Sequence, residues 1–195
     1  MTFFRATLVS VLLGSAALAQ NNASFVRANS FEVGGFVGAS HGLDRYQVMG
    51  GGNVTYAVNK YILPYTEFTY IPGLRQQIEK TKGYYQRNLT DFHGGVHLRM
   101  PIFRESPIVP YGAFGVGLLH SNAPTGQQVN SAGTASSITG IGPSSSLAVN
   151  GGGGLRFYIG QRFGLRTEAK VYHSTSDSLR ATFYKVEFGV FFQIR

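Results

Sequence analysis

Two histidines four residues apart, in the stretch HGGVH from His93 to His97, are the first residues whose spacing suggests chemistry. On a helix such a pair can bind one metal ion, because residues i and i+4 share a face. The surrounding residues instead predict a strand, on which the two imidazoles lie roughly 13 Å apart at about 3.3 Å per residue. We therefore predict two interior histidines that form hydrogen bonds, and no metal site.

The run GGGG from Gly151 to Gly154 suggests a phosphate-binding loop, but no Lys-Ser or Lys-Thr pair follows it. The flanking residues LAVN and LRFYI are typical of a strand and not of a helix. Glycines inside a barrel strand relieve curvature and leave room for large neighbouring side chains. The run therefore predicts part of a strand, and we expect no cofactor.

A third candidate is His173, in the stretch YHSTSDS, together with Glu187 further along the chain. Nucleophilic catalysis needs its groups within hydrogen-bond reach on one side of a wall. By strand alternation His173 belongs to an apolar face, whereas Glu187 belongs to a polar one. We predict no catalytic residues and a protein that is not an enzyme.

The elements that position these residues show a period of two. In the closing stretch ATFYKVEFGVFFQIR, alternate residues from Thr182 to Ile194 are apolar or threonine, and Lys185 and Glu187 lie between them. Segments of about 9 to 13 residues repeat the pattern, a length that suits membrane-crossing strands tilted by about 45°. The eight segments are Phe31 to Ala39, Gln47 to Val58, Tyr61 to Ile71, Leu89 to Met100, Ile108 to Leu119, Leu147 to Ile159, Phe163 to His173 and Thr182 to Ile194.

The two faces of these segments differ in the same way throughout. One face carries aromatic and aliphatic residues such as Phe31, Val54 and Phe92. The other carries five acidic residues and five Lys or Arg residues, a balance that suits a closed interior, because an unpaired buried charge is costly. We predict that this face forms a structural interior network, whose members are Glu32, Glu67, Asp91, His93, His97, Arg99, Arg156, Arg166, Glu168, Lys170, Lys185 and Glu187.

The N-terminus, MTFFRATLVSVLLGSAALAQ, has the pattern of a secretory signal peptide, with one positive charge, a short apolar run and small residues at Ala17 and Ala19. We expect cleavage after Ala19, so that residues 1–19 form the signal peptide and residues 20–195 form a single barrel domain. The chain has no cysteine, 13% charged residues and a net charge of +8. Export argues against nucleic acid as the partner of this positive charge and favours an anionic lipid surface.

The lengths of the connections alternate along the chain. The links after the second, fourth and sixth segments are Asn59-Lys60, PIFRESP and GQR, whereas the two longest links, from Pro72 to Asn88 and from Ser121 to Ser146, follow odd segments. A membrane barrel with both termini in the periplasm alternates long outer loops with short inner turns in this way. The predicted fold class is therefore all-β, an eight-stranded antiparallel up-and-down transmembrane β-barrel.

The signal peptide, the eight alternating segments, the glycine-rich strands and the closing FYKVEFGVFFQIR resemble the small outer-membrane β-barrel family that includes the transmembrane domain of OmpA and the Opa-type and OmpX-type proteins. The resemblance implies a place in the cell outer membrane, and recognition of the last strand by the barrel-assembly machinery. The aromatic residue that usually ends that strand is missing here, because Gln193, Ile194 and Arg195 follow Phe192. We expect a monomer with a structural or surface-interaction role, in contact with outer-membrane lipid and lipopolysaccharide.

Three alternatives stay open. A soluble lipid-binding barrel would show the same alternation with its apolar residues inside. A passive small-solute channel would need a continuous water path past the interior charges. An outer-membrane acyl hydrolase is the third, because YHSTSDS resembles the motif of the lipid A deacylases, in which Ser stands two residues after His and a Glu lies on the following strand; Thr175 takes the Ser position here.

Overall fold

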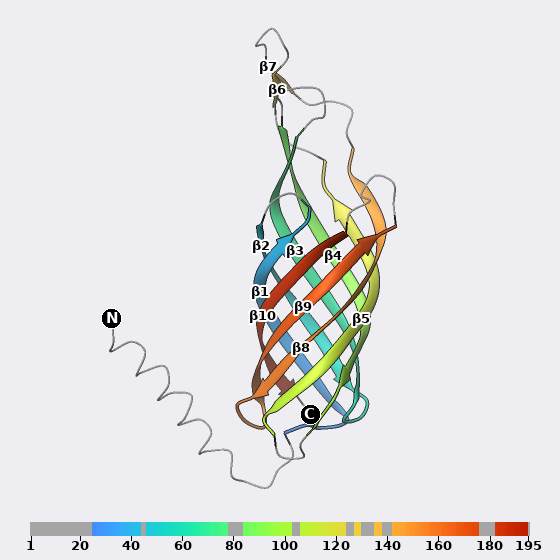
Figure 1. Cartoon of the computed structure of the whole chain (residues 1–195), viewed down its shortest axis with the longest axis vertical. Helices are drawn as coiled ribbons and strands as arrows, with labels where there is room; N and C mark the ends of the chain where they lie inside the picture. Colours follow the sequence, from blue (N-terminus) through green and yellow to red (C-terminus); the bar gives the residue numbers. More distant parts are fainter. Residues whose placement is uncertain are drawn as a thin grey trace, which may run out of the picture.

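The computed structural model describes residues 25–43, 46–77, 84–102, 106–123, 127–129, 135–137, 142–175 and 182–194, and it contains a closed barrel (Figure 1). Eight antiparallel strands form the wall in the order β1-β10-β9-β8-β5-β4-β3-β2, so that β10 closes against β1. In the described part of the chain, no helix has the length and apolar character needed to cross a membrane. The expected signal peptide, residues 1–19, lies outside the described residues.

The strands confirm the predicted all-β, eight-stranded, up-and-down fold. Outside the wall, β6 (Gln127–Val129) and β7 (Ala135–Ser137) form a small separate sheet within the predicted loop from Ser121 to Ser146. Apart from β3 and β4, the observed strand ends lie within three residues of the predicted ones. The barrel strands are β1 (Ser30–His41), β2 (Gln47–Ala57), β3 (Ile62–Gln77), β4 (Tyr84–Arg99), β5 (Ile108–Ser121), β8 (Ser144–Tyr158), β9 (Phe163–Ser174) and β10 (Thr182–Ile194).

β3 and β4 are longer than the alternation predicts. The sequence predicts a loop from Pro72 to Asn88, but the two 16-residue strands continue through most of it, so this prediction is wrong. The register shifts between Ile71 and Leu74, where Gly73 has a positive φ of 70° and donates its N–H to Asn88 Oδ1 at 2.9 Å. This β-bulge breaks the period-2 pattern, which is why the alternation stops while the hairpin continues.

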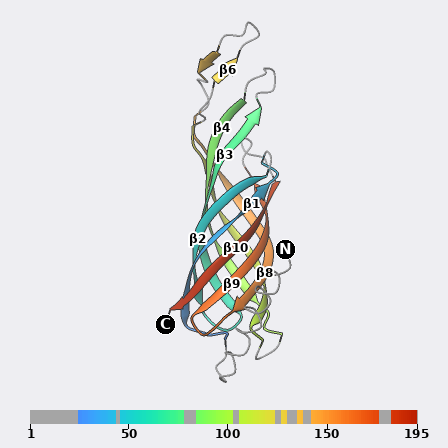
Figure 2. The same ribbon diagram turned by 90° about the vertical axis from the view of Figure 1, so that its left-hand side faces the viewer.

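The two ends of the barrel differ. At the compact end β1 begins, β10 finishes, and the links are residues 58–61, 100–107 and 159–162. Asn59 closes the first of these links, because its Oδ1 accepts the N–H groups of Tyr61 at 2.7 Å and Ile62 at 2.8 Å. At the opposite, extended end the β3–β4 hairpin and the β6–β7 sheet project beyond the other strands (Figure 2).

The wall turns its apolar face outward. Phe188 is 61% exposed, whereas its neighbour Glu187 is completely buried. This orientation contradicts the soluble lipid-binding barrel, which would place the apolar face inside and the charges outside. Exposed apolar side chains form an outer belt around the barrel, which includes Phe31, Val33, Val37, Val48, Val54, Phe68, Phe92, Leu98, Phe114, Val116, Leu118, Leu147, Val149, Leu165, Val171, Tyr184, Val186, Phe188, Val190, Phe192 and Ile194.

Candidate functional site

The structure places all twelve residues of the predicted interior network in the lumen. Each is at most 2% exposed, and they come from β1, β3, β4, β8, β9 and β10. Their positions along the strands divide them into three clusters, one at the compact end, one in the middle and one toward the extended end. Charged groups buried to this degree need partners, and the three clusters supply them.

The middle cluster surrounds Lys170 on β9. Its Nζ lies 2.6 Å from a carboxylate oxygen of Glu67 and 2.6 Å from one of Glu168, and 3.7 Å from Glu187. The guanidinium of Arg166 lies 3.3 Å from Glu67, 3.5 Å from Glu187 and 3.9 Å from Glu168. Two cations thus contact all three carboxylates, and these contacts connect β3 with β9 and β10 across the lumen.

The register between β9 and β10 makes this cluster necessary. Glu168 lies directly opposite Glu187, and Lys170 lies directly opposite Lys185. Like charges directly opposite each other destabilise a strand pair. Lys170 and Arg166 of the middle cluster contact both Glu168 and Glu187. They therefore offset the repulsion between the two carboxylates across this strand pair.

At the compact end the carboxylate of Glu32 accepts hydrogen bonds from Arg156 and, at 3.4 Å, from Arg99. Arg99 also donates to two backbone carbonyl oxygens, that of Arg27 at 3.1 Å and that of Asn59 at 2.9 Å. The cluster therefore ties the segment before β1 to the β2–β3 turn. It fixes the rim of the barrel at this end.

Toward the extended end, Asp91 forms an ion pair with Lys185 and a hydrogen bond with His93. The ammonium of Lys185 also donates to Thr69 Oγ1 at 3.1 Å. This cluster joins β10 to β3 and β4, which are not its neighbours in the wall. It again connects opposite sides of the barrel.

The two histidines of HGGVH lie in the lumen, each with its own hydrogen-bond partners. His93 contacts Asp91, as described above, and His97 Nδ1 lies 3.0 Å from a guanidinium nitrogen of Arg156. His97 Nε2 lies 3.5 Å from Glu168. The two imidazoles therefore belong to different clusters of the network.

Two apolar clusters close the network at its ends, and sequence reasoning missed them. Phe183 and Phe191 have the same parity as Lys185 and Glu187 on β10, so the alternation contained the signal. The interior of an eight-stranded barrel is just wide enough for side chains to fill it, and these clusters lie at the two ends of the network. The extended-end cluster consists of Met49, Ile71, Leu74, Leu89, Leu119, Ala148, Tyr172 and Phe183, and the compact-end cluster of Phe25, Val109, Tyr158 and Phe191.

Tyrosines occupy the lumen beside glycines. Tyr65 stacks on His97 with ring centroids 4.1 Å apart. A Cβ atom added at Gly115 would lie 2.5 Å from the Tyr65 hydroxyl, and one at Gly154 would lie 2.9 Å from the Tyr111 hydroxyl. The glycine run at residues 151–154 belongs to β8. Its last residue, Gly154, has no side chain and leaves room for that of Tyr111.

The constellation considered for acyl hydrolysis does not assemble. His173 is on the exposed face, with its Nδ1 3.0 Å from Thr182 Oγ1. Glu187 is buried in the lumen on the other side of the wall. The two residues cannot share one reacting group, because the sheet lies between them.

The three carboxylates of the middle cluster are the arrangement nearest to a metal site among the described residues. Oxygen atoms of Glu67, Glu168 and Glu187 lie within 4.8 Å of one another, and hard cations favour oxygen ligands. The ammonium of Lys170 contacts all three carboxylates. It places a positive charge beside all three carboxylates, where a metal ion would otherwise bring one.

No protein-family model and no curated protein matches this sequence. Among solved structures, the chain is similar to Neisserial surface protein A, with a TM-score of 0.59 and 9% identity over 85% of this chain and 96% of that chain. It is also similar to the N-terminal β-barrel domain of Pseudomonas aeruginosa OprF (TM-score 0.53, 15% identity, 86% and 98% covered) and to a major outer membrane protein from Thermus thermophilus (TM-score 0.53, 10% identity, 84% and 99% covered). At such identities the likeness shows the fold alone. The chain has the eight-stranded barrel fold of small outer-membrane proteins, and the fold expected from the sequence resemblance is confirmed.

Proposed function

We propose that this protein is a monomeric outer-membrane β-barrel with a structural or surface-interaction role and no catalytic activity. The observation that carries the proposal is the inverted distribution of side chains, with an apolar outer belt and paired charges in the lumen. Such a wall is stable in lipid, because the belt contacts hydrocarbon and the closed sheet leaves no unpaired strand edge. The signal peptide expected at residues 1–19 supports export toward this membrane.

The dimensions of the strands support the same placement. An 11-residue strand tilted by about 45° spans roughly 25 Å at about 3.3 Å per residue, which is the height of the apolar band of membrane barrels. The 16 residues of β3 or β4 would span about 37 Å, more than the roughly 30 Å of a hydrocarbon core. We infer that the extended end faces the outside of the cell and that the compact end faces the periplasm.

The partner we propose for the extended end is lipopolysaccharide. The stretch from Pro72 to Asn88 carries Arg75, Lys80, Lys82 and Arg87 against Glu79. Arg87 is buried, so the other three cations are the candidates for contact with an anionic surface polymer. During biogenesis, we propose that the barrel-assembly machinery recognises β10, whose outward face is apolar up to Ile194.

Two measurements test the membrane placement. In a gel that compares boiled with unboiled protein, we expect the unboiled chain to migrate as a separate folded species. Fractionation should recover the protein with the outer membrane. As a test for catalysis, the mass of lipid A should not change when the protein is expressed. Equal migration in both lanes together with recovery in the soluble fraction would contradict the proposal, and a shift in lipid A mass would contradict the absence of catalysis.

Conductance in planar bilayers tests the channel alternative. A channel would need water to pass both apolar clusters and the ion pairs between them. We therefore expect no stepwise current from the natural chain. Regular single-channel steps would favour a passive channel over a structural role.

A further inference from the structure

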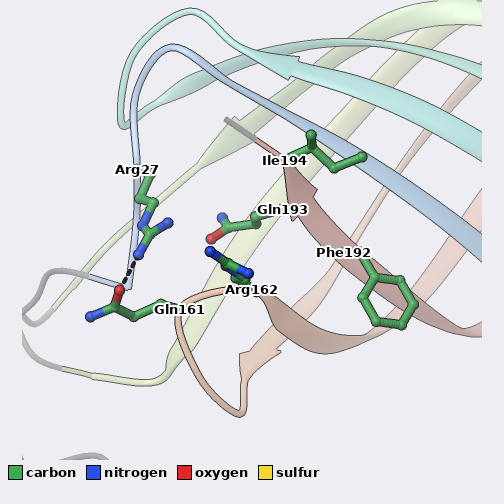
Figure 3. A pocket seen from close by; sticks show the side chains of 6 residues that line it. All are labelled: Arg27, Gln161, Arg162, Phe192, Gln193 and Ile194. Carbon is green, nitrogen blue, oxygen red and sulfur yellow. Dashed lines mark hydrogen bonds between the residues drawn. The ribbon is translucent and has the colours of Figure 1, made fainter.

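A hollow at the compact end contains two arginines beside lipid-facing residues. It is lined by Arg27, Gln161, Arg162, Phe192, Gln193 and Ile194, from the segment before β1, the β8–β9 turn and the end of β10 (Figure 3). The guanidinium of Arg27 donates a hydrogen bond to Gln161 Oε1. The side chain of Arg162 is exposed and has no hydrogen bond or ion pair with the described residues.

The positive charge of the hollow is not neutralised by the described part of the chain. All five carboxylates described by the structure lie in the lumen. The one nearest along the strands, Glu32, is engaged by Arg99 and Arg156. Two guanidinium groups without a facing carboxylate favour an anionic ligand, and the planar guanidinium matches the oxygens of a phosphate.

One side of the hollow is apolar. Phe192 and Ile194 are each 53% exposed and belong to the outer belt. Across the seam between β10 and β1 they pair with Val33 and Phe31, which are also exposed. The hollow therefore opens directly onto the surface that contacts hydrocarbon, so a ligand with an anionic head and apolar tails fits both parts.

Gln193 adds a hydrogen-bond acceptor to the hollow. Its Nε2 donates to Glu32 Oε1 at 3.2 Å, which fixes the orientation of the amide. Its carbonyl oxygen is buried and has no partner among the described residues. An unsatisfied buried acceptor is costly, so a ligand that brings a hydroxyl donor would relieve this cost.

We propose that the hollow binds one anionic glycerophospholipid from the periplasmic leaflet. The phosphate lies between Arg27 and Arg162, a headgroup hydroxyl donates to the carbonyl oxygen of Gln193, and the acyl chains follow Phe192 and Ile194. Basic pockets in membrane proteins bind phospholipid headgroups by the same electrostatic attraction. The inference rests on the proposed outer-membrane placement with the compact end toward the periplasm.

The test uses the full mature barrel in vesicles of equal parts dioleoyl phosphatidylglycerol and dioleoyl phosphatidylcholine. After release into detergent, native mass spectrometry measures the ratio of the two lipids that stay bound. The natural chain should retain one phosphatidylglycerol, and R27Q/R162Q should lower the ratio about 25-fold, about fivefold for each guanidinium. R162Q alone should lower it about fivefold. Lys60, exposed on the β2–β3 turn at the same end, provides the control K60Q, which should leave the ratio unchanged.

The outcomes separate this inference from the proposed function. A boiled-versus-unboiled gel on the same samples reports insertion, so a chain that does not insert contradicts the membrane placement itself. An inserted chain that shows equal lipid ratios for the natural protein and R27Q/R162Q overturns the lipid site alone. A loss in K60Q as large as in R162Q would also overturn it, because general surface charge would then explain the preference. Displacement of the lipid by excess inorganic phosphate would identify a free-phosphate site instead.

Discussion

Replacing Lys170 by Met tests whether the middle cluster stabilises the barrel. Met retains much of the volume but removes the Nζ atom, which lies 2.6 Å from both Glu67 and Glu168 and 3.7 Å from Glu187. The three carboxylates lie within 4.8 Å of one another, so each pair repels by about 3.5 kcal/mol at an effective dielectric near 20. Because Arg166 still offsets part of this repulsion, we expect K170M to lower the free energy of unfolding by about 3 to 5 kcal/mol.

Unfolding in urea, with the barrel inserted in vesicles, measures this cost. The chain has no Trp and 11 Tyr, so tyrosine fluorescence and the fraction of folded band on an unboiled gel follow the transition. K60M, which removes an exposed Lys, should change the free energy of unfolding by no more than about 0.5 kcal/mol. Adding E187Q to K170M removes one repelling charge and should couple favourably by more than about 0.5 kcal/mol. If K170M unfolds at the same urea concentration as K60M, water screens the carboxylates and the network does not hold the wall.

Three further perturbations test the wall and its orientation. Phe188→Arg should lower the free energy of unfolding by about 2 to 4 kcal/mol if the residue lies near the membrane midplane, whereas Phe188→Leu should change it little; equal effects would place the residue in water. Gly95→Ala should lower the free energy of unfolding by about 1 to 3 kcal/mol, because the new Cβ would lie 2.7 Å from a backbone atom of β5. Gly160→Ala adds a Cβ with nothing within 4 Å, so it should be close to neutral in the same urea assay. A protease applied to intact cells should cut, if anywhere, between β3 and β4 or between residues 121 and 146, and cleavage confined to the compact-end links would invert the orientation.

Much of the wall could be predicted from the sequence. The alternation from Thr182 to Ile194 predicts the bounds of β10 and places Phe188 outside and Glu187 inside, as the structure has them. This works because side chains on a strand alternate between two faces, and a closed barrel has only an inside and an outside. A residue's parity therefore assigns it to one of the two faces without any knowledge of its partners.

Prediction failed where the period is interrupted or where the interior becomes apolar. The bulge at Gly73 shifts the register, so the alternation no longer follows the β3–β4 hairpin. Phe183 and Phe191 lie in the lumen although a polar interior was expected from their neighbours. Parity assigns a residue to a face, but the character of that face changes toward the ends of the barrel.

The sequence by itself thus determined the bounds of most strands and which residues share a face of the wall, and only the tertiary structure decided which face is inside and which residues meet. Glu67 and Lys170 are 103 residues apart and belong to strands on opposite sides of the barrel, and Arg27 meets Gln161 at a separation of 134 residues. The height of a side chain in the lumen depends on the tilt and stagger of its strand, which the register of all eight pairings sets together when the barrel closes. No local sequence pattern contains the register of all eight pairings. The ion pairs and the hollow at the compact end therefore exist only in the closed fold.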